Sequence, residues 1–506
     1  MVRRAALLLL ALAACRFDDA TGAPDGFPRT VVDPARPLSL DNPQEDTVTW
    51  PLWGGAFRLE GPVVLRTALQ AEGPASLLIA GPGAPRQRFA VELAWTGDEW
   101  LLRERDGRAT LQEIPIRDPG LVTIEPAGAS VLVTVDDSEH TFVPSTPPAE
   151  LELGLYVSLE PGSHLAITDL ALSAPLPSSE EELGVPLREL AAARGLSIGS
   201  AVDIWPPRHD LGFEAMLGEQ FATAAPTELY WATTRGEDED FFTLPADLVV
   251  NYAAVHEQRV TGMFLVWDFE LPRWIRRLAR TDPDRLGDVL DEHIATLVGR
   301  YAGEVDAWVV VNEAIWGPEE NGGGPAEWAD TLWYGALGAE HIERAFRAAR
   351  AADPAAVLLY NETGAEALGP KSDFMFGMAS DFVARDVPID AIGLQFHVDA
   401  AAPPDIRDVR ANMRRFARLG LEVHITELDV SMANLAGSEE ENLEVQADVY
   451  RDVVEACLAV TGCTTTTVFG FSDRYAWDEL GDAAPLLFDS AYRPKPAFFA
   501  VQSALE

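Results

Sequence analysis

The sequence predicts two folded domains of different class, an all-β sandwich followed by an α/β domain with the (β/α)8 TIM barrel fold. Three observations support this prediction. The chain has 506 residues, which is too long for one hydrophobic core, because cores stop growing at about 250–300 residues. Short runs of alternating apolar and polar residues fill the first third. Continuous apolar runs that alternate with amphipathic stretches fill the rest, as in a parallel sheet covered by helices.

The first fifteen residues are typical of a secretory signal. Arg3 and Arg4 precede an apolar stretch over residues 5–14, which stops at Cys15. Residues 12–15 also resemble a bacterial lipobox, in which the cysteine is lipidated; the alternative is an ordinary signal peptide cleaved nearby. The apolar stretch over residues 5–14 is too short to span a bilayer, and no run of about 18 apolar residues occurs elsewhere, so no transmembrane helix is expected. We therefore predict an exported protein, either secreted or anchored at the cell envelope through lipid on Cys15.

The next two segments differ in pattern. Residues 16–43 are rich in Asp, Pro, Gly and Thr and have no periodicity, which is typical of a flexible linker. Residues 44–175 contain short alternating runs such as 90–95, 130–135 and 151–157. Their spacing predicts an antiparallel, jelly-roll-like sandwich. Exposed tryptophans in such a domain can stack on sugars, which would make it carbohydrate-binding, but most tryptophans in a small sandwich belong to the core.

The barrel prediction, for residues 183–506, depends on counting strand-and-helix units. Eight apolar runs bounded by polar residues indicate strands buried on both faces; they cover residues 196–204, 221–229, 263–269, 307–314, 357–361, 391–398, 423–430 and 465–472. Between them, apolar residues recur every three to four positions, as in helices, for example over residues 284–301, 338–352, 404–419 and 441–460. Eight such units predict a closed barrel.

The charge balance limits the classes of partner. The chain has 38 Lys and Arg residues against 81 Asp and Glu residues, a formal net charge of −43. Such a surface repels nucleic acid and anionic membranes, which favours a neutral or cationic ligand. The alternative is that the charge serves only solubility. A membrane partner is expected only through the lipid anchor at Cys15.

Cysteine and histidine patterns give no sign of a metal or cofactor. The sequence contains neither an HExxH motif nor paired CxxC motifs, so we expect no metal and no cofactor. Cys457 and Cys463 are the two cysteines outside the predicted signal. In an exported protein so close a pair favours a disulfide, and two isolated buried thiols are the alternative.

Polar residues at the ends of the predicted barrel strands are the candidates for chemistry, because all eight strands lead to one mouth. Glu313 ends the fourth strand, His397 the sixth, and Glu427 lies near the end of the seventh. Two carboxyl groups across one cleft suit glycosidic bond cleavage, where one stays protonated and the other ionised. The alternative is that each Glu belongs to a structural ion pair with Arg.

The sequence around these positions resembles glycoside hydrolase family 10, the endo-β-1,4-xylanases. The resemblance extends from about Leu187 to Ala504. It is carried, in order, by residues 308–314 (WVVVNEA), 389–397 (IDAIGLQFH), 425–429 (ITELD), 468–477, 485–489 and 495–497.

The resemblance implies a reaction and a role for each residue. The reaction is hydrolysis of internal β-1,4 linkages of xylan by a retaining double displacement, with Glu313 as general acid/base and Glu427 as nucleophile. Their carboxyl groups are then expected ~5–5.5 Å apart. The substrate-binding residues implied are Asn312, Gln395, His397, Trp477 and Trp267; His397 and Asp429 would also support the nucleophile. Many family members carry a disulfide where Cys457 and Cys463 stand.

Some positions depart from the family pattern and leave the substrate open. They are Thr227, Tyr230, Met263, Asp268, Val309 and Phe469. Most of these positions contact sugars on the non-reducing side in the family, so a decorated xylan, another β-glycan or another glycoside remains an alternative. A second alternative is a non-catalytic carbohydrate-binding protein at the cell surface, with its function in the sandwich or on the barrel. We expect a monomer whose partner is the polysaccharide.

Overall fold

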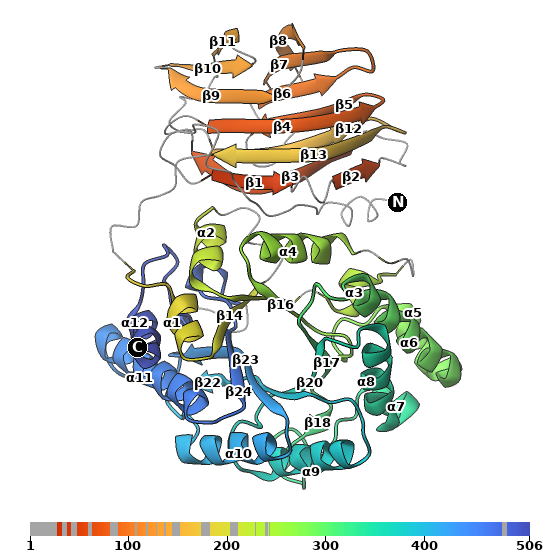
Figure 1. The fold of residues 1–506 in the computed structure, drawn as a ribbon, viewed down its shortest axis with the longest axis vertical. Coiled ribbons are helices and arrows are strands. Elements are labelled where there is room, and N and C mark those ends of the chain that lie inside the picture. Colours follow the sequence, from red (N-terminus) through yellow and green to blue (C-terminus); the bar gives the residue numbers. More distant parts are fainter. Residues whose placement is uncertain are drawn as a thin grey trace. The chain divides into compact units, whose positions relative to one another are not determined.

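The chain forms two compact units, which are described separately (Figure 1). The computed structural model describes residues 28–32, 38–41, 48–58, 63–80, 90–106, 109–117, 120–127, 129–135, 138–143, 152–173, 183–202, 211–227, 229–237, 241, 243–477 and 483–506. The predicted signal with Cys15, and the start of the predicted linker, lie outside these residues.

The first unit consists of two antiparallel sheets, between which the chain passes back and forth. One sheet has the order β1 (Pro28–Val32), β13 (His164–Ser173), β4 (Val63–Glu72), β9 (Leu121–Ala127), β10 (Ser130–Val135), β11 (Ser138–Phe142), with β2 (Leu38–Asp41) also paired to β13. The other has the order β3 (Val48–Arg58), β12 (Glu152–Leu159), β5 (Ala75–Ala80), β6 (Ala90–Trp95), β7 (Trp100–Asp106), β8 (Ala109–Ile116).

Side-chain alternation explains the core of this unit. On β10, Val131, Val133 and Val135 are buried while the residues between them are partly exposed, as expected for a strand with one face on a core. Hydrogen bonds join the two sheets, such as that from Gln112 Nε2 on β8 to the carbonyl of Thr141 on β11, at 3.3 Å. Antiparallel strands therefore precede the barrel, as predicted.

The predicted linker is not free of regular structure. Strands β1 and β2 lie within residues 16–43, and both pair with β13. Their partner lies more than a hundred residues away in the chain. Local composition cannot show a pairing of that kind, because edge strands are stabilised by hydrogen bonds to a distant partner.

The second unit is a closed parallel barrel, so the prediction of a TIM barrel is confirmed (Figure 1). Its eight strands are β14 (Ser197–Val202), β15 (Thr223–Pro226), β16 (Arg259–Gly262), β17 (Ala307–Asn312), β20 (Val357–Glu362), β21 (Ala391–Leu394), β23 (Glu422–Ser431) and β24 (Cys463–Val468). Each pairs in parallel with its neighbours, and β24 pairs with β14 to close the ring. A short strand, β22 (His397–Asp399), pairs in parallel with the last residues of β23.

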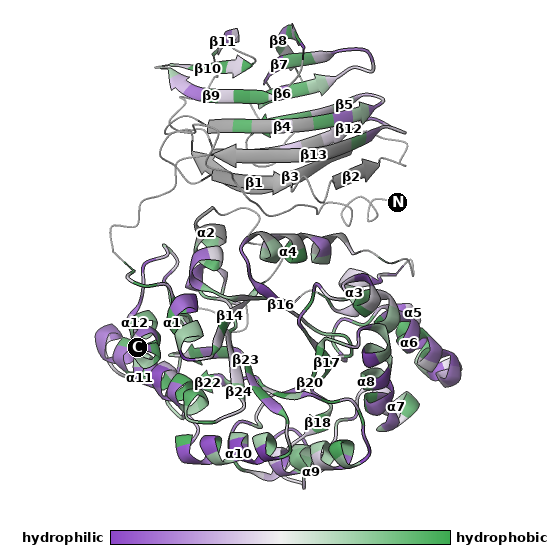
Figure 2. Cartoon of the chain, viewed as in Figure 1, coloured by the Kyte–Doolittle hydropathy of each residue, from purple (hydrophilic) through white to green (hydrophobic). Residues whose placement is uncertain are grey.

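Helices follow the strands around the barrel (Figure 1). They are α1 (Leu187–Ala193), α2 (Leu211–Gln220), α3 (Trp231–Thr234), α4 (Leu244–Val255), α5 (Arg273–Thr281), α6 (Pro283–Arg300), α7 (Leu332–Leu337), α8 (Glu340–Ala352), α9 (Pro370–Ala384), α10 (Ile406–Arg418), α11 (Glu439–Leu458) and α12 (Pro496–Leu505). On α10 the buried Val409, Met413 and Phe416 recur at helical spacing. Figure 2 shows the corresponding mixture of hydrophobic and hydrophilic residues on α10 and α11. None of the helices in the described part of the chain combines the length and apolar character needed to cross a membrane.

The third predicted strand, residues 263–269, is misplaced. The strand itself is β16, and the apolar run follows it. Leu265 N and Val266 N still donate to the carbonyls of Val309 and Val310 at 3.0 Å, and residues 263–266 are buried. The apolar composition of residues 263–266 therefore reflects their burial beside β17. The regular strand, β16, lies just before these residues in the sequence.

The two cysteines meet at the base of the eighth strand. Cys457 lies near the end of α11, and Cys463 begins β24. They form a disulfide with Cα atoms 5.2 Å apart. The bridge closes the turn between helix and strand.

Candidate active site

Strand β17 delivers Glu313 to the barrel mouth through a change of backbone conformation. Asn312 is the last residue of the strand, and Glu313 has a φ of 55°. This left-handed conformation is unusual for a residue with a side chain, and surrounding contacts must hold it. Glu313 N donates to the carbonyl of Asn361 on β20 at 3.1 Å.

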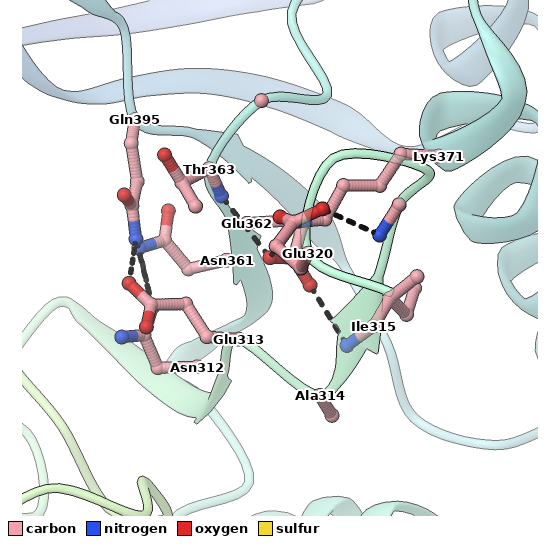
Figure 3. Close-up of polar contacts among 12 residues, drawn as sticks. Asn312, Glu313, Ala314, Ile315, Glu320, Asn361, Glu362, Thr363, Lys371 and Gln395 are labelled. Atoms are coloured by element: carbon pink, nitrogen blue, oxygen red, sulfur yellow. Dashed lines mark hydrogen bonds and ion pairs between the residues drawn. The ribbon is translucent and has the colours of Figure 1, made fainter. Parts of the chain in front are cut away.

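Both carboxylate oxygens of Glu313 accept a hydrogen bond from a predicted site residue. Gln395 Nε2 donates to Oε1 at 2.8 Å, and Trp267 Nε1 donates to Oε2 at 3.0 Å. Gln395 Nε2 is also 3.3 Å from Asn312 Oδ1. Figure 3 shows Gln395 directed at Glu313 and Asn312. The carboxyl group is therefore oriented from two sides while remaining partly exposed.

Glu427 lies deeper, on β23, with only 4% of its surface exposed. Asn361 Nδ2 donates to its Oε1 at 2.6 Å, and His397 Nε2 lies 3.3 Å from its Oε2. Burial raises the pKa of Glu427, His397 and Asn361 oppose that rise, and the charge of Glu313 adds to it. Hydrogen bonds connect the two carboxyl groups through the amides of Asn361, Asn312 and Gln395.

His397 lies between two carboxylates. Its Nδ1 is 2.6 Å from Asp429 Oδ2, and its Nε2 faces Glu427. Burial alone would lower the pKa of His397, but hydrogen bonds to Asp429 and Glu427 outweigh it and raise the pKa to about 10. The imidazole is therefore a cation beside Glu427 at neutral pH, which favours the ionised form of that carboxyl group.

Asn361 connects the two halves of the site, although it is not among the residues expected from the sequence. Its Nδ2 donates to Asn312 Oδ1 at 2.8 Å as well as to Glu427. Thr426 Oγ1 donates to its Oδ1 at 2.7 Å. Gly393 makes room for this amide, because a Cβ there would lie 2.3 Å from Asn361 Oδ1. Asn361 follows an apolar run, so the rule that polar residues end barrel strands could have identified it.

Aromatic rings flank the carboxyl groups. Trp477, 40% exposed, stacks on His397 with ring centroids 5.6 Å apart and meets Phe469 edge-on. Trp267, next to Glu313, stacks on the exposed Phe269 with centroids 4.5 Å apart. Such faces are suited to sugar rings, which bury apolar C–H groups against aromatic surfaces.

Four of the six positions that depart from the family pattern fall into two groups. Met263 and Val309 belong to an apolar cluster inside the barrel and offer no polar group to a ligand. Asp268 and Tyr230 lie beside the aromatic wall: Asp268 Oδ2 accepts from Leu332 N at 3.0 Å, and Tyr230 meets Phe269 edge-on. Burial raises the pKa of Asp268. Among the described residues no group of three or more acidic, His or Cys side chains is arranged to hold a metal ion.

Comparison with protein families agrees with this geometry. The model of glycosyl hydrolase family 10 matches residues 186–504, which include all eight barrel strands. The chain belongs to glycosyl hydrolase family 10. It is therefore a glycoside hydrolase, and the predicted enzyme class is confirmed.

Relatives of this family 10 chain include named xylanases and solved structures. Endo-1,4-beta-xylanase B of Thermotoga neapolitana is 33% identical over 328 residues, 64% of this chain and 92% of the relative. Endo-1,4-beta-xylanase A of Humicola insolens is 33% identical over 335 residues, 63% of this chain and 86% of the relative. The crystal structure of native xylanase 10B from Thermotoga maritima matches 63% of this chain and 98% of its own, with 34% identity and a TM-score of 0.59.

Proposed function

We propose that this family 10 hydrolase cleaves internal β-1,4 linkages of xylan with retention of configuration. The main support is the pair Glu313 and Glu427, held at one mouth by a shared network of amides. A glycosidase needs two carboxyl groups with different roles. The xylanase relatives named above support xylan as the substrate.

Glu313 is the proposed general acid and base, and Glu427 the proposed nucleophile. Glu313 gives its proton to the leaving oxygen while Glu427 attacks the anomeric carbon, forming a glycosyl-enzyme. Glu313 then removes a proton from the water that hydrolyses this intermediate. His397, held by Asp429, keeps Glu427 ionised despite its burial. The separation of ~5–5.5 Å expected for retention stays a prediction.

Asn312 has a free donor suited to a sugar hydroxyl. Its Oδ1 accepts from Asn361 and Gln395, whereas its Nδ2 is buried with no partner in the part of the chain that the structure describes. Buried donors rarely stay unsatisfied. We assign this amide to the 2-hydroxyl of the reacting sugar, with Gln395 on the same sugar and Trp477 and Trp267 as its aromatic walls.

A direct assay tests which glycan is the substrate. Beechwood xylan, arabinoxylan, mixed-linkage β-glucan and an aryl β-xylobioside are incubated with the protein, and reducing ends are measured. We expect release from xylan, and NMR should show the β-anomer as the first product. Preference for the glucan would favour the alternative of another β-glycan, because Tyr230 and Asp268 depart from the family pattern beside the aromatic wall. Binding without release from any substrate would favour the non-catalytic alternative.

The acid side of the pH profile provides a test of His397. Turnover requires ionised Glu427, so kcat/KM falls as pH drops through the pKa of that group, which burial raises. His397→Asn removes the neighbouring cation, so the acid limb should move to higher pH and activity should fall more at pH 5 than at pH 7. His424→Asn is the control, since His424 lies on β23, the strand that carries Glu427, but pairs with Glu422 instead. An unchanged acid limb in His397→Asn would contradict the assignment.

The location of the protein, the function of its first unit and its oligomeric state are proposals that rest on the sequence. We propose that Cys15 is lipidated after export, that residues 44–175 bind carbohydrate, and that the protein is a monomer. Incorporation of labelled fatty acid by the wild type but not by Cys15→Ala tests the anchor. Pull-down of the chain by insoluble xylan, with and without residues 44–175, tests the binding role, and light scattering tests the oligomeric state.

A further inference from the structure

The turn that carries Glu313 is anchored to strand β20 at three consecutive residues. Glu313 N donates to the backbone carbonyl of Asn361 at 3.1 Å. The next two amides use side chains instead: Ala314 N donates to Tyr360 Oη at 3.1 Å, and Ile315 N donates to Glu362 Oε2 at 3.2 Å. Figure 3 shows Ile315 N directed at Glu362. Two of the three anchors therefore depend on the identity of residues on β20.

Glu362 is the centre of this anchor. It is completely buried, and each neighbour donates to it: Tyr360 Oη at 2.6 Å, Thr363 N at 3.2 Å and Lys371 Nζ at 3.2 Å, besides Ile315 N. Burial raises the pKa of Glu362, Lys371 and Tyr360 oppose that rise, and the charge of Glu313 adds to it. A carboxylate surrounded only by donors accepts from all of them when ionised.

Lys371 completes the cluster from helix α9. Besides Glu362 it pairs with Glu320, in the loop that follows the turn, and it is itself buried. Glu320 Oε2 accepts from Gly317 N at 2.8 Å. The cluster thus ties helix α9, strand β20 and residues 314–317 together (Figure 3). Its carboxylates do not touch Glu427, which has separate hydrogen-bond partners.

We propose that Glu362 is a positioning residue for the proton donor, acting through Ile315 directly and through Tyr360 on Ala314. This inference rests on the proposed role of Glu313. Glu313 adopts a left-handed backbone conformation, which persists only where neighbouring contacts hold it. Loss of the two side-chain anchors lets the turn relax and moves the carboxyl group away from the leaving oxygen. Misplacement of a catalytic group by about 1 Å can cost ~10²-fold in rate.

Dependence on the leaving group separates positioning of the acid from general damage to the fold. In Glu362→Gln the amide replaces one accepting oxygen by a donor, and in Tyr360→Phe only the hydroxyl is lost. With phenyl β-xylobioside, which needs a proton, both variants should lose about 10- to 100-fold in kcat/KM. With dinitrophenyl β-xylobioside, which leaves without one, the loss should stay below about threefold. Equal losses on both substrates, or none on either, would overturn the proposal.

Asp306→Asn is the matched control. Asp306 also pairs with a cation, Arg259, and its Oδ2 accepts from Val260 N at 2.9 Å, but it lies at the opposite end of β17. We expect it to leave the ratio of the two kcat/KM values unchanged. If Glu362→Gln does not fold, as judged by circular dichroism, Tyr360→Phe decides the outcome.

The same kinetic measurements distinguish failure of the proposed function from failure of the positioning role of Glu362. If the wild type cleaves neither aryl substrate, or if Glu313→Ala loses kcat/KM equally on both, the acid assignment itself fails. If Glu313→Ala shows the expected difference and the β20 variants do not, only the positioning role of Glu362 is lost.

Discussion

Glu427→Ala is expected to lose turnover on every glycoside substrate, by a factor on the order of 10⁵ in kcat/KM. Without the nucleophile no glycosyl-enzyme forms. The loss should therefore be as large for substrates with an activated leaving group as for xylan. The side chain is buried between Asn361 and His397, so its removal also leaves space for a small anion. Azide should therefore restore cleavage of dinitrophenyl β-xylobioside and give the α-glycosyl azide, the product of a single inversion.

The control for this variant lies on the same strand. Glu422, at the opposite end of β23, pairs with His424 and accepts from Thr464 Oγ1. Residues at that end of a barrel contribute to stability rather than catalysis, so Glu422→Ala should stay within about threefold of the wild type in kcat/KM. Retained turnover by Glu427→Ala, with the β-anomer still formed first, would show that another group is the nucleophile.

Glu313→Ala is expected to have the second largest effect, and one that depends on the substrate. On xylan kcat/KM should fall by about 10³-fold, because the leaving sugar oxygen requires a proton. On dinitrophenyl β-xylobioside the fall should be less than about tenfold, because that leaving group departs unprotonated. Measuring kcat/KM on both substrates with the same enzyme preparation checks the ratio of the two losses.

Azide also distinguishes this variant from the previous one. In Glu313→Ala the nucleophile remains, so azide attacks the glycosyl-enzyme and the product is the β-glycosyl azide, after two inversions. A milder comparison removes one hydrogen bond to Glu313 and keeps the acid: Trp267→Phe replaces the indole by a smaller aromatic ring and loses the donor to Oε2. An α-azide from Glu313→Ala would mean that the roles of the two carboxyl groups are exchanged.

The sequence was sufficient for the barrel because its signals are local. Most of the barrel strands lie in apolar runs, the helices have apolar residues at three- to four-residue spacing, and the carboxyl-bearing residues lie at or near the ends of the runs. Since parallel barrel strands all lead to one mouth, Glu313 and Glu427 were expected together although more than a hundred residues separate them. The structure places both there, joined through Gln395, Asn312 and Asn361.

Other features were not predictable because they depend on partners from elsewhere in the chain. The run after β16 is apolar because it is buried beside β17, and its composition could not show that the regular ladder ends at Gly262. Strands β1 and β2 exist through pairing with β13.

The sequence by itself determined the fold class of the barrel and the family, because periodicity and short motifs are properties of consecutive residues. Only the tertiary structure decided how the site is held: the amide of Asn361 between two strands, the cation at His397, and the anchors from Tyr360 and Glu362 to the turn of Glu313. Hydrogen bonds and pKa shifts depend on distance in space. Residues that are remote in the chain acquire those properties only when the ring of strands closes.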